Sequence, residues 1–182
     1  MKLILDTKPK ILDHIDTVSC PDNRAHTLTQ HYQENFHDKT TEELRNRKKL
    51  FPNELALGDW KRLLTSEQFE VTRLNCTEIS GSSPLNKVSE NGKFHCVSCD
   101  KPLFDFQSKY KSGSGWPSFF KPINANAVKE LTDYHAGYAR TDIRCARCGA
   151  HLGHMFNDGP PPTGLRYCMN GIALKFVKEQ LP

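Results

Sequence analysis

The sequence lacks the long apolar runs that export or membrane insertion requires. Near its start only Leu3 to Leu5 are consecutively apolar, whereas a signal peptide needs roughly 7–15 apolar residues and a membrane-spanning helix about 20. A mitochondrial presequence is usually poor in acids, yet Asp6, Asp13 and Asp16 stand here. We therefore expect a cytoplasmic protein with no membrane partner, mitochondrial import being the alternative, and we expect a monomer.

Strong net charge is also missing. The chain has 182 residues, of which 25 are basic and 21 acidic, so its net charge is only +4. No stripe of Lys and Arg is interleaved with aromatic residues, which argues against a nucleic-acid partner. The length suits one domain of ordinary size that can bury a sizeable core.

Cysteine is too scarce for a disulfide scaffold, because the chain has only seven. An odd number cannot pair completely within one chain. Four of the seven form two Cys-x-x-Cys pairs, which in a chain without secretory features indicate metal binding or redox chemistry. The other three need separate explanations: Cys20, Cys76 and Cys168.

The chain divides near residue 56. Apolar residues in 1–56 are scattered, which predicts a weakly structured extension with a short helix around Thr41–Leu50. A single folded domain follows over residues 57–182. There, Thr65 and Gln68 fit a capping box and predict a helix over Ser66–Asn75.

From Phe94 onward, short apolar runs alternate with Gly, Pro, Asn and Asp. This pattern predicts a mainly β domain with antiparallel strands, because neither a helical bundle nor a βαβ sheet has such short segments. The predicted strands are Lys93–Val97, Tyr134–Ile143, Leu165–Met169 and Ile172–Val177.

The two cysteine pairs are the strongest local signal. Two residues between cysteines form a tight knuckle that directs both thiolates at one point, and two knuckles complete a tetrahedral shell of sulfur ligands. Such a shell suits a structural Zn²⁺ ion and leaves no open coordination position. The alternative is that the cysteines are buried apolar residues or one redox dithiol. The proposed ligands are Cys96, Cys99, Cys145 and Cys148.

A second group of candidate residues surrounds Cys168. In a strand, a period of two places Arg166, Cys168 and Asn170 on one face, a polar and electropositive setting that favours a thiolate. His151 and His154 could then donate a proton to whatever the thiolate attacks. Cys168 could instead be a small buried residue, and the histidines could be metal ligands.

Trp116 lies in a glycine-rich loop and precedes Pro117. A flexible loop of this kind displays an aromatic face that can contact a methyl or sulfur group. A core tryptophan beside a turn is an equally good interpretation of the same residues.

Three runs of sequence now show a resemblance to a known family. Lys111–Phe119 (KSGSGWPSF), Arg144–Gly159 (RCARCGAHLGHMFNDG) and Pro162–Asn170 (PTGLRYCMN) closely resemble the methionine-R-sulfoxide reductase B family, in the same order. The resemblance extends from about Trp60 to Phe176. It implies two antiparallel β-sheets with a few peripheral helices, a zinc site away from the catalytic cleft, and reduction of the R epimer of methionine sulfoxide.

The resemblance also implies residue roles. Cys168 matches the nucleophile, which attacks the sulfoxide sulfur and becomes a sulfenic acid, while His154 and His151 match the acid and polarising groups. Asn170 matches a hydrogen-bonding residue of the active site. The remaining matches form the substrate pocket and its polar support: Trp116, Phe156, Arg166 and Asp158.

One departure from the family matters for recycling. Many members have a second, resolving cysteine in the loop before the tryptophan, where this chain has Ser114. We expect Cys76 to form the disulfide with Cys168 instead, and thioredoxin or a similar dithiol to reduce it. Cys20, or direct reduction of the sulfenic acid by a small thiol, are the alternatives. Free or protein-bound methionine sulfoxide in oxidised proteins would be the substrate.

A different class of function is also compatible with the two knuckles. A non-enzymatic zinc-binding interaction module would need the four cysteines and would leave Cys168 without a role.

Overall fold

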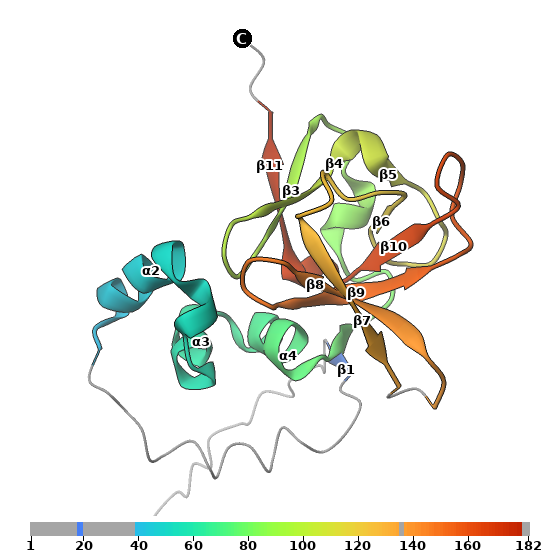
Figure 1. Ribbon diagram of the computed structural model, residues 1–182. Helices are drawn as coiled ribbons and strands as arrows, with labels where there is room; N and C mark the ends of the chain where they lie inside the picture. Colours follow the sequence, from blue (N-terminus) through green and yellow to red (C-terminus); the bar gives the residue numbers. More distant parts are fainter. Residues whose placement is uncertain (1–17, 20–38, 135–136, 180–182) are drawn as a thin grey trace, which may run out of the picture.

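Two antiparallel β-sheets form the body of the protein in a computed structural model, which describes residues 18–19, 39–134 and 137–179 (Figure 1). The larger sheet has the strand order β5-β6-β10-β9-β8-β7 and the smaller one β11-β3-β4, and a two-stranded pair, β1-β2, lies beside them. The larger sheet contains β5 (Lys109–Tyr110), β6 (Ser118–Phe119), β7 (Val128–Asp133), β8 (Arg140–Cys145), β9 (His151–Phe156) and β10 (Arg166–Met169). The others are β1 (Val18–Ser19), β2 (Thr77–Glu78), β3 (Gly92–Cys96), β4 (Pro102–Asp105) and β11 (Leu174–Lys178).

A cluster of aromatic rings joins the two sheets in the core. Phe94 and Phe104, from β3 and β4, both pack on Phe119 of β6, with ring centroids 4.9 Å and 4.4 Å apart. Tyr167 of β10 adds a fourth ring at 5.9 Å from Phe104. Burial alternates along β3, where Phe94 and Cys96 face the core, and along β10, where Tyr167 does. The prediction of a mainly β fold with two antiparallel sheets is confirmed.

Helix α4 (Ser66–Leu74) begins where its capping box predicts. The Thr65 hydroxyl accepts from the Gln68 N–H, and the Gln68 side chain accepts from the Thr65 N–H, each at 3.2 Å. The helix ends one residue before the predicted end, because Asn75 takes a left-handed conformation with φ of 62°. This turn leads the chain directly into Cys76 and β2.

Ordered helices reach further back along the chain than the expected boundary near residue 56. Helix α2 (Thr41–Leu50) has the predicted bounds, and α3 (Leu57–Leu63) packs next to it at one side of the sheets (Figure 1). Leu44 and Leu55 are buried, so this part of the expected extension is packed. The sequence hides this because most of α2 is polar and faces solvent. Residues 1–17 and 20–38 lie outside the described part.

Short 3₁₀ turns connect the main elements. They cover Pro52–Glu54 (η1), Pro84–Lys87 (η2), Phe106–Ser108 (η3) and Gly171–Ala173 (η4). Within the described ranges, no helix combines the length and apolar character needed to cross a membrane.

The predicted strand Tyr134–Ile143 differs from the structure. Strand β7 ends at Asp133 and β8 begins at Arg140, and between them the Gly137 N–H donates to the Tyr134 carbonyl. Tyr134 is 70% exposed, so an aromatic residue of a type common in strands lies outside both strands here. It directly follows Asp133, a residue of the candidate site.

Candidate active site and metal centre

Four buried cysteines come together at one end of the two sheets. Each knuckle closes with a backbone hydrogen bond, from Asp100 N–H to the Cys96 carbonyl and from Gly149 N–H to the Cys145 carbonyl. Asp100 and Gly149 both have positive φ, 63° and 69°, so the two turns have matching geometry. Each thiol of the first knuckle lies next to a thiol of the second. The sulfurs of Cys96 and Cys148 are 3.7 Å apart, and those of Cys99 and Cys145 are 3.6 Å apart.

These distances fit a tetrahedral metal site. Zinc–sulfur bonds of about 2.3 Å place the sulfurs of a tetrahedron about 3.8 Å apart. All four sulfurs lie within 4.8 Å of one another, so the cluster could hold a metal ion. The other cysteines, Cys145 first, lower the pKa of the Cys148 thiol by hydrogen bonding, and Arg73 adds to this. Thiolate is the form that binds metal.

The helices are attached to this cluster through Arg73. Its guanidinium donates to the Cys148 carbonyl at 2.8 Å and lies 3.7 Å from the Cys148 sulfur. The same guanidinium stacks on the Trp60 ring of α3 at 3.8 Å. One arginine therefore links α3 and α4 to the second knuckle, a link that no local motif indicated.

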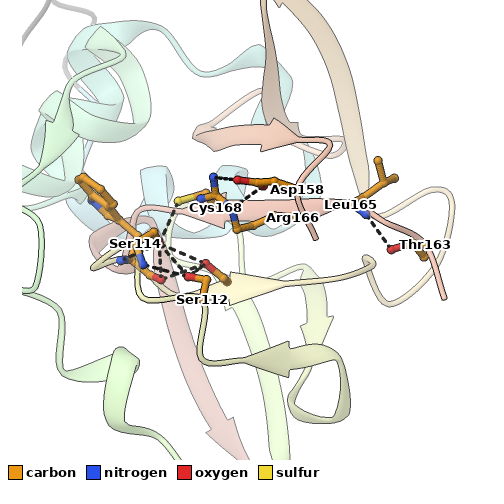
Figure 2. A network of polar contacts seen from close by, with 9 residues as sticks. Ser112, Ser114, Asp158, Thr163, Leu165, Arg166 and Cys168 are labelled. Carbon is orange, nitrogen blue, oxygen red and sulfur yellow. Dashed lines mark hydrogen bonds and ion pairs between the residues drawn. The ribbon is translucent and has the colours of Figure 1, made fainter. Parts of the chain in front are cut away.

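Cys168 has a different environment, in the middle of the larger sheet. It lies on β10 opposite Ser118 of β6 and His154 of β9, and its side chain is half-buried. Figure 2 shows Cys168 between the Ser112–Ser114 loop and the pair formed by Arg166 and Asp158. The Ser114 hydroxyl is 3.6 Å from the Cys168 sulfur, and it also contacts the Ser112 hydroxyl at 2.9 Å. The thiol thus faces a polar surface that carries hydroxyl groups.

Arg166 lies on the same face of β10 as Cys168. Both are half-buried, while Tyr167 and Met169 are buried on the other side, as the period of two predicts. Two hydrogen bonds of 2.8 Å join the Arg166 guanidinium to the Asp158 carboxylate, which lowers the pKa of Asp158. The guanidinium also stacks on the Phe156 ring at 4.4 Å, so its position is fixed from two sides.

A bulge in β9 brings the two histidines together. Residues three apart in a regular strand point to opposite faces. Here the pairing of β8 with β9 skips Leu152, which shifts the register by one residue, and the rings of His151 and His154 lie 5.3 Å apart. Gly153 is needed in this bulge, because a Cβ atom there would lie 2.2 Å from the Cys168 carbonyl oxygen.

Each histidine is held by a carboxylate that the sequence reasoning missed. His151 is buried, and its Nδ1 lies 2.6 Å from Asp142 of β8. The Nε2 atom of His151 has no partner among the described residues. His154 Nε2 lies 2.8 Å from Asp133, which also accepts from Arg140 at 2.6 Å. Burial lowers the pKa of His154, and the hydrogen bond to Asp133 opposes this.

Trp116 and Asn170 are fixed by the same strand, β2. The indole Nε1–H of Trp116 donates to the Glu78 carbonyl at 3.2 Å. Asn170 has left β10 and is buried; its Oδ1 accepts from the Glu78 N–H at 3.0 Å, and its Nδ2 donates to the Leu152 carbonyl at 3.2 Å. Strand β10 ends at Met169, one residue short of the span that would include Asn170, so Asn170 lies just beyond the strand that carries Cys168. No role was predicted for Glu78, although it lies two residues after Cys76.

A cavity of about 500 Å³ adjoins this region. Ser114 and Arg166, the two neighbours of Cys168, form part of its wall. The loop before Trp116 and the turn that begins at Asp158 supply the rest: Tyr110, Lys111, Ser112, Gly113, Asp158, Gly159 and Pro160. A larger hollow of about 740 Å³ lies between the start of α4 and β11, and no cysteine or histidine lines it.

Cys76 is fully buried at the end of α4 and forms a disulfide. Cys168 and the four clustered cysteines are free thiols, so Cys76 and Cys168 are not joined to each other here. Residues 18–19 pair with Thr77–Glu78, immediately after Cys76. Cys20, the alternative recycling residue, lies outside the described residues.

Comparison with known proteins agrees with the motifs. The SelR domain family matches residues 64–178. "Peptide methionine sulfoxide reductase MsrB" of Pseudomonas fluorescens (strain Pf0-1) is 49% identical over 70% of this chain and 97% of its own length. The protein of the same name from Pseudomonas syringae pv. syringae (strain B728a) is 51% identical over 67% of this chain and 93% of its own length. A solved structure titled "Crystal Structure of Mis18 'Yippee-like' Domain" covers 50% of this chain with a TM-score of 0.41 and 15% identity, too weak a likeness to support an argument. The chain belongs to the MsrB family of peptide methionine sulfoxide reductases.

Proposed function

We propose that the protein reduces the R epimer of methionine sulfoxide with Cys168 as the nucleophile. One observation supports this most: Cys168 of β10 is a half-buried free thiol directly opposite His154 of β9, and Ser114 and Arg166 beside it line a cavity. The relatives' name, peptide methionine sulfoxide reductase, agrees with this chemistry. Free and protein-bound methionine sulfoxide both present the same reacting group.

The first step reduces the substrate and oxidises Cys168. The Cys168 thiolate attacks the sulfoxide sulfur while a histidine protonates the sulfoxide oxygen. The attack forms a sulfur–sulfur bond, and the protonated oxygen leaves the substrate as water. A water molecule then attacks the Cys168 sulfur, which breaks the sulfur–sulfur bond, releases methionine and leaves Cys168 as a sulfenic acid, oxidised by two electrons. Asp142 and Asp133 keep the rings of His151 and His154 oriented for this proton transfer.

Pocket residues would hold the substrate for this attack. The Trp116 indole ring and Phe156 offer apolar surface to the S-methyl group. The buried amide of Asn170 and the Arg166–Asp158 pair supply polar contacts at the edge of the pocket.

Cys76 is the proposed resolving residue. Its thiol condenses with the Cys168 sulfenic acid to a disulfide and releases water, and an external dithiol such as thioredoxin then reduces that disulfide by exchange. Because Cys76 is disulfide-bonded in this structure, its own disulfide must be reduced before it can react.

The four-cysteine cluster is proposed to hold a structural Zn²⁺ ion. Its sulfur distances and its burial support this, and four protein ligands leave no position for substrate. Arg73, stacked on Trp60, would then hold α3 and α4 against the metal site.

The reductase is tested with both sulfoxide epimers, free and within a peptide, and a dithiol. Pure protein should consume the R epimer alone. Consumption of only the S epimer would reject the proposed specificity. Consumption of neither would reject the reductase and favour a non-enzymatic zinc-binding interaction module.

The recycling route needs a separate test. Cys76→Ser should retain one turnover and lose thioredoxin-driven multiple turnover. After one oxidation, peptide mass spectrometry should find Cys168 joined to Cys76; a link to Cys20, or a stable sulfenic acid, would replace that assignment.

A further inference from the structure

Glu78 binds three parts of the site that are distant in the sequence. Its carboxylate accepts hydrogen bonds from the Gly171 and Ile172 backbone N–H groups at 2.7 Å and 2.8 Å. Its own N–H donates to Asn170 at 3.0 Å, and its carbonyl accepts from the Trp116 indole at 3.2 Å. The side chain thus holds the turn that follows Cys168's strand, while the backbone holds two proposed site residues.

Burying a carboxylate in this way is costly for the fold. Glu78 is 1% exposed, and desolvation raises its pKa, although the Gly171 and Ile172 amides oppose that shift. No cation accompanies it in the hydrogen bonds of the described residues. An apolar residue would fill the same space without this cost. A specific contact therefore explains the carboxylate better than packing does.

The position of β2 depends on these contacts. The strand is two residues long, and among the described strands its only ladder partner is β1, itself two residues long. So short a pair has little stability of its own. The Glu78 carboxylate instead anchors β2 to η4, the turn that begins directly after Asn170.

We propose that Glu78 is a positioning residue of the reductase reaction. Its carboxylate fastens β2 to the turn after Cys168's strand, and its backbone in consequence holds the Trp116 indole ring and the Asn170 amide, two of the proposed pocket residues. This role rests on the proposed function. It predicts that a change at Glu78, which contacts no substrate, alters both substrate binding and the rate of the first step.

The test is Glu78→Gln. The amide keeps one acceptor oxygen but turns an NH₂ group toward one of two backbone N–H groups that both need an acceptor. A misplacement of about 1 Å can lower a rate about 10²-fold, so we expect KM for the sulfoxide to rise and the single-turnover rate to fall by about 10- to 100-fold. In ¹⁵N–¹H spectra, the indole signal of Trp116 should shift while that of Trp60 stays.

Glu43→Gln is the matched control. Glu43 also accepts a backbone N–H, that of Thr40, but it lies on the exposed surface of α2. This variant should leave the kinetics and both indole signals unchanged.

Two results would overturn the proposal. One is a folded Glu78→Gln protein with an unmoved Trp116 signal and unchanged KM and single-turnover rate; the other is equal changes in both indole signals, which would indicate general loosening. If Glu78→Gln does not fold, Glu78→Asp, which keeps two acceptor oxygens on a shorter stem, is judged by the same criteria. The Trp116 signal needs no activity, so an inactive wild-type protein would reject the proposed function and leave this measurement valid.

Discussion

The free cysteines among the residues that the structure describes occupy two regions with different surroundings. In the knuckle cluster (Cys96, Cys99, Cys145 and Cys148), each residue is buried and the sulfurs lie next to one another, with the Arg73 guanidinium also close to Cys148. Cys168 is half-buried and has the Ser114 hydroxyl nearby, and Ser114 lines a cavity. Reactivity follows access and surroundings. One region can fill a metal's coordination shell, and the other can meet a substrate.

The two regions also differ in what supports them. Each knuckle is closed by its own backbone turn, so its geometry is local. The surroundings of Cys168 come from β6, β9, the loop before Trp116 and the turn after Asp158, which only the complete sheet brings together. Changes in the cluster should therefore affect stability first, and changes around Cys168 should affect chemistry first.

The largest expected effect is on activity. Cys168→Ser should lower R-sulfoxide reduction by at least about 10³-fold, because the hydroxyl is a far weaker nucleophile than a thiolate. Thermal unfolding should change little, since the substitution is nearly isosteric. A stopped assay and a melting curve on the same sample measure both. Substantial residual turnover would remove Cys168 from its proposed role.

The opposite result is expected in the cluster. Cys148→Ser should lower the melting temperature by more than about 10 °C. A structural zinc site contributes many kcal/mol to the free energy of unfolding, and the loss of each kcal/mol lowers the melting temperature of a protein of this length by about 2–4 °C. Metal content, measured by mass spectrometry of the intact protein, should fall with it. An unchanged melting temperature would show that the metal, if bound, does not hold the fold.

A third substitution would place a resolving thiol in the loop before Trp116. Ser114→Cys places a thiol where a hydroxyl lies 3.6 Å from the Cys168 sulfur. In the Cys76→Ser background, we expect it to restore multiple turnover with thioredoxin by at least about 10-fold, through a disulfide between positions 114 and 168. Ser112→Cys is the control. Failure of both would show that the loop cannot approach closely enough.

The smallest effect concerns the histidines. Burial, opposed by Asp133, places the pKa of His154 below its usual 6.5. A histidine with a lowered pKa stabilises the folded protein less as pH falls through 6.5, because the unfolded chain then binds more protons. In Asp133→Asn the pKa of His154 should fall further. The decline of the single-turnover rate that follows deprotonation of His154 should then occur at lower pH, and the step should be slower by about 10-fold.

Asp59→Asn serves as the control for that substitution. Asp59 accepts a backbone N–H at the start of α3, away from the histidines. Its pH profile should match that of the unchanged protein. If the pH dependence of the single-turnover rate is unchanged in Asp133→Asn, Asp133 does not orient His154 for the reaction.

Local spacing was enough to predict several elements correctly. The Thr65–Gln68 capping box gave the start of α4, and the two Cys-x-x-Cys pairs gave the cluster, because both depend on residues three apart. The strand between Tyr134 and Ile143 was placed wrongly because exposed tyrosines outside the strands resemble a strand.

By itself, the sequence determined the fold class, the four knuckle cysteines and the family. Only the tertiary structure decided how the site is supported. Glu78 meets Asn170 and Gly171 across 92 and 93 residues of sequence, and a one-residue bulge brings His151 and His154 to the same side of the sheet. Such contacts depend on how the sheets and short turns pack against one another, and no pattern of neighbouring residues encodes that packing.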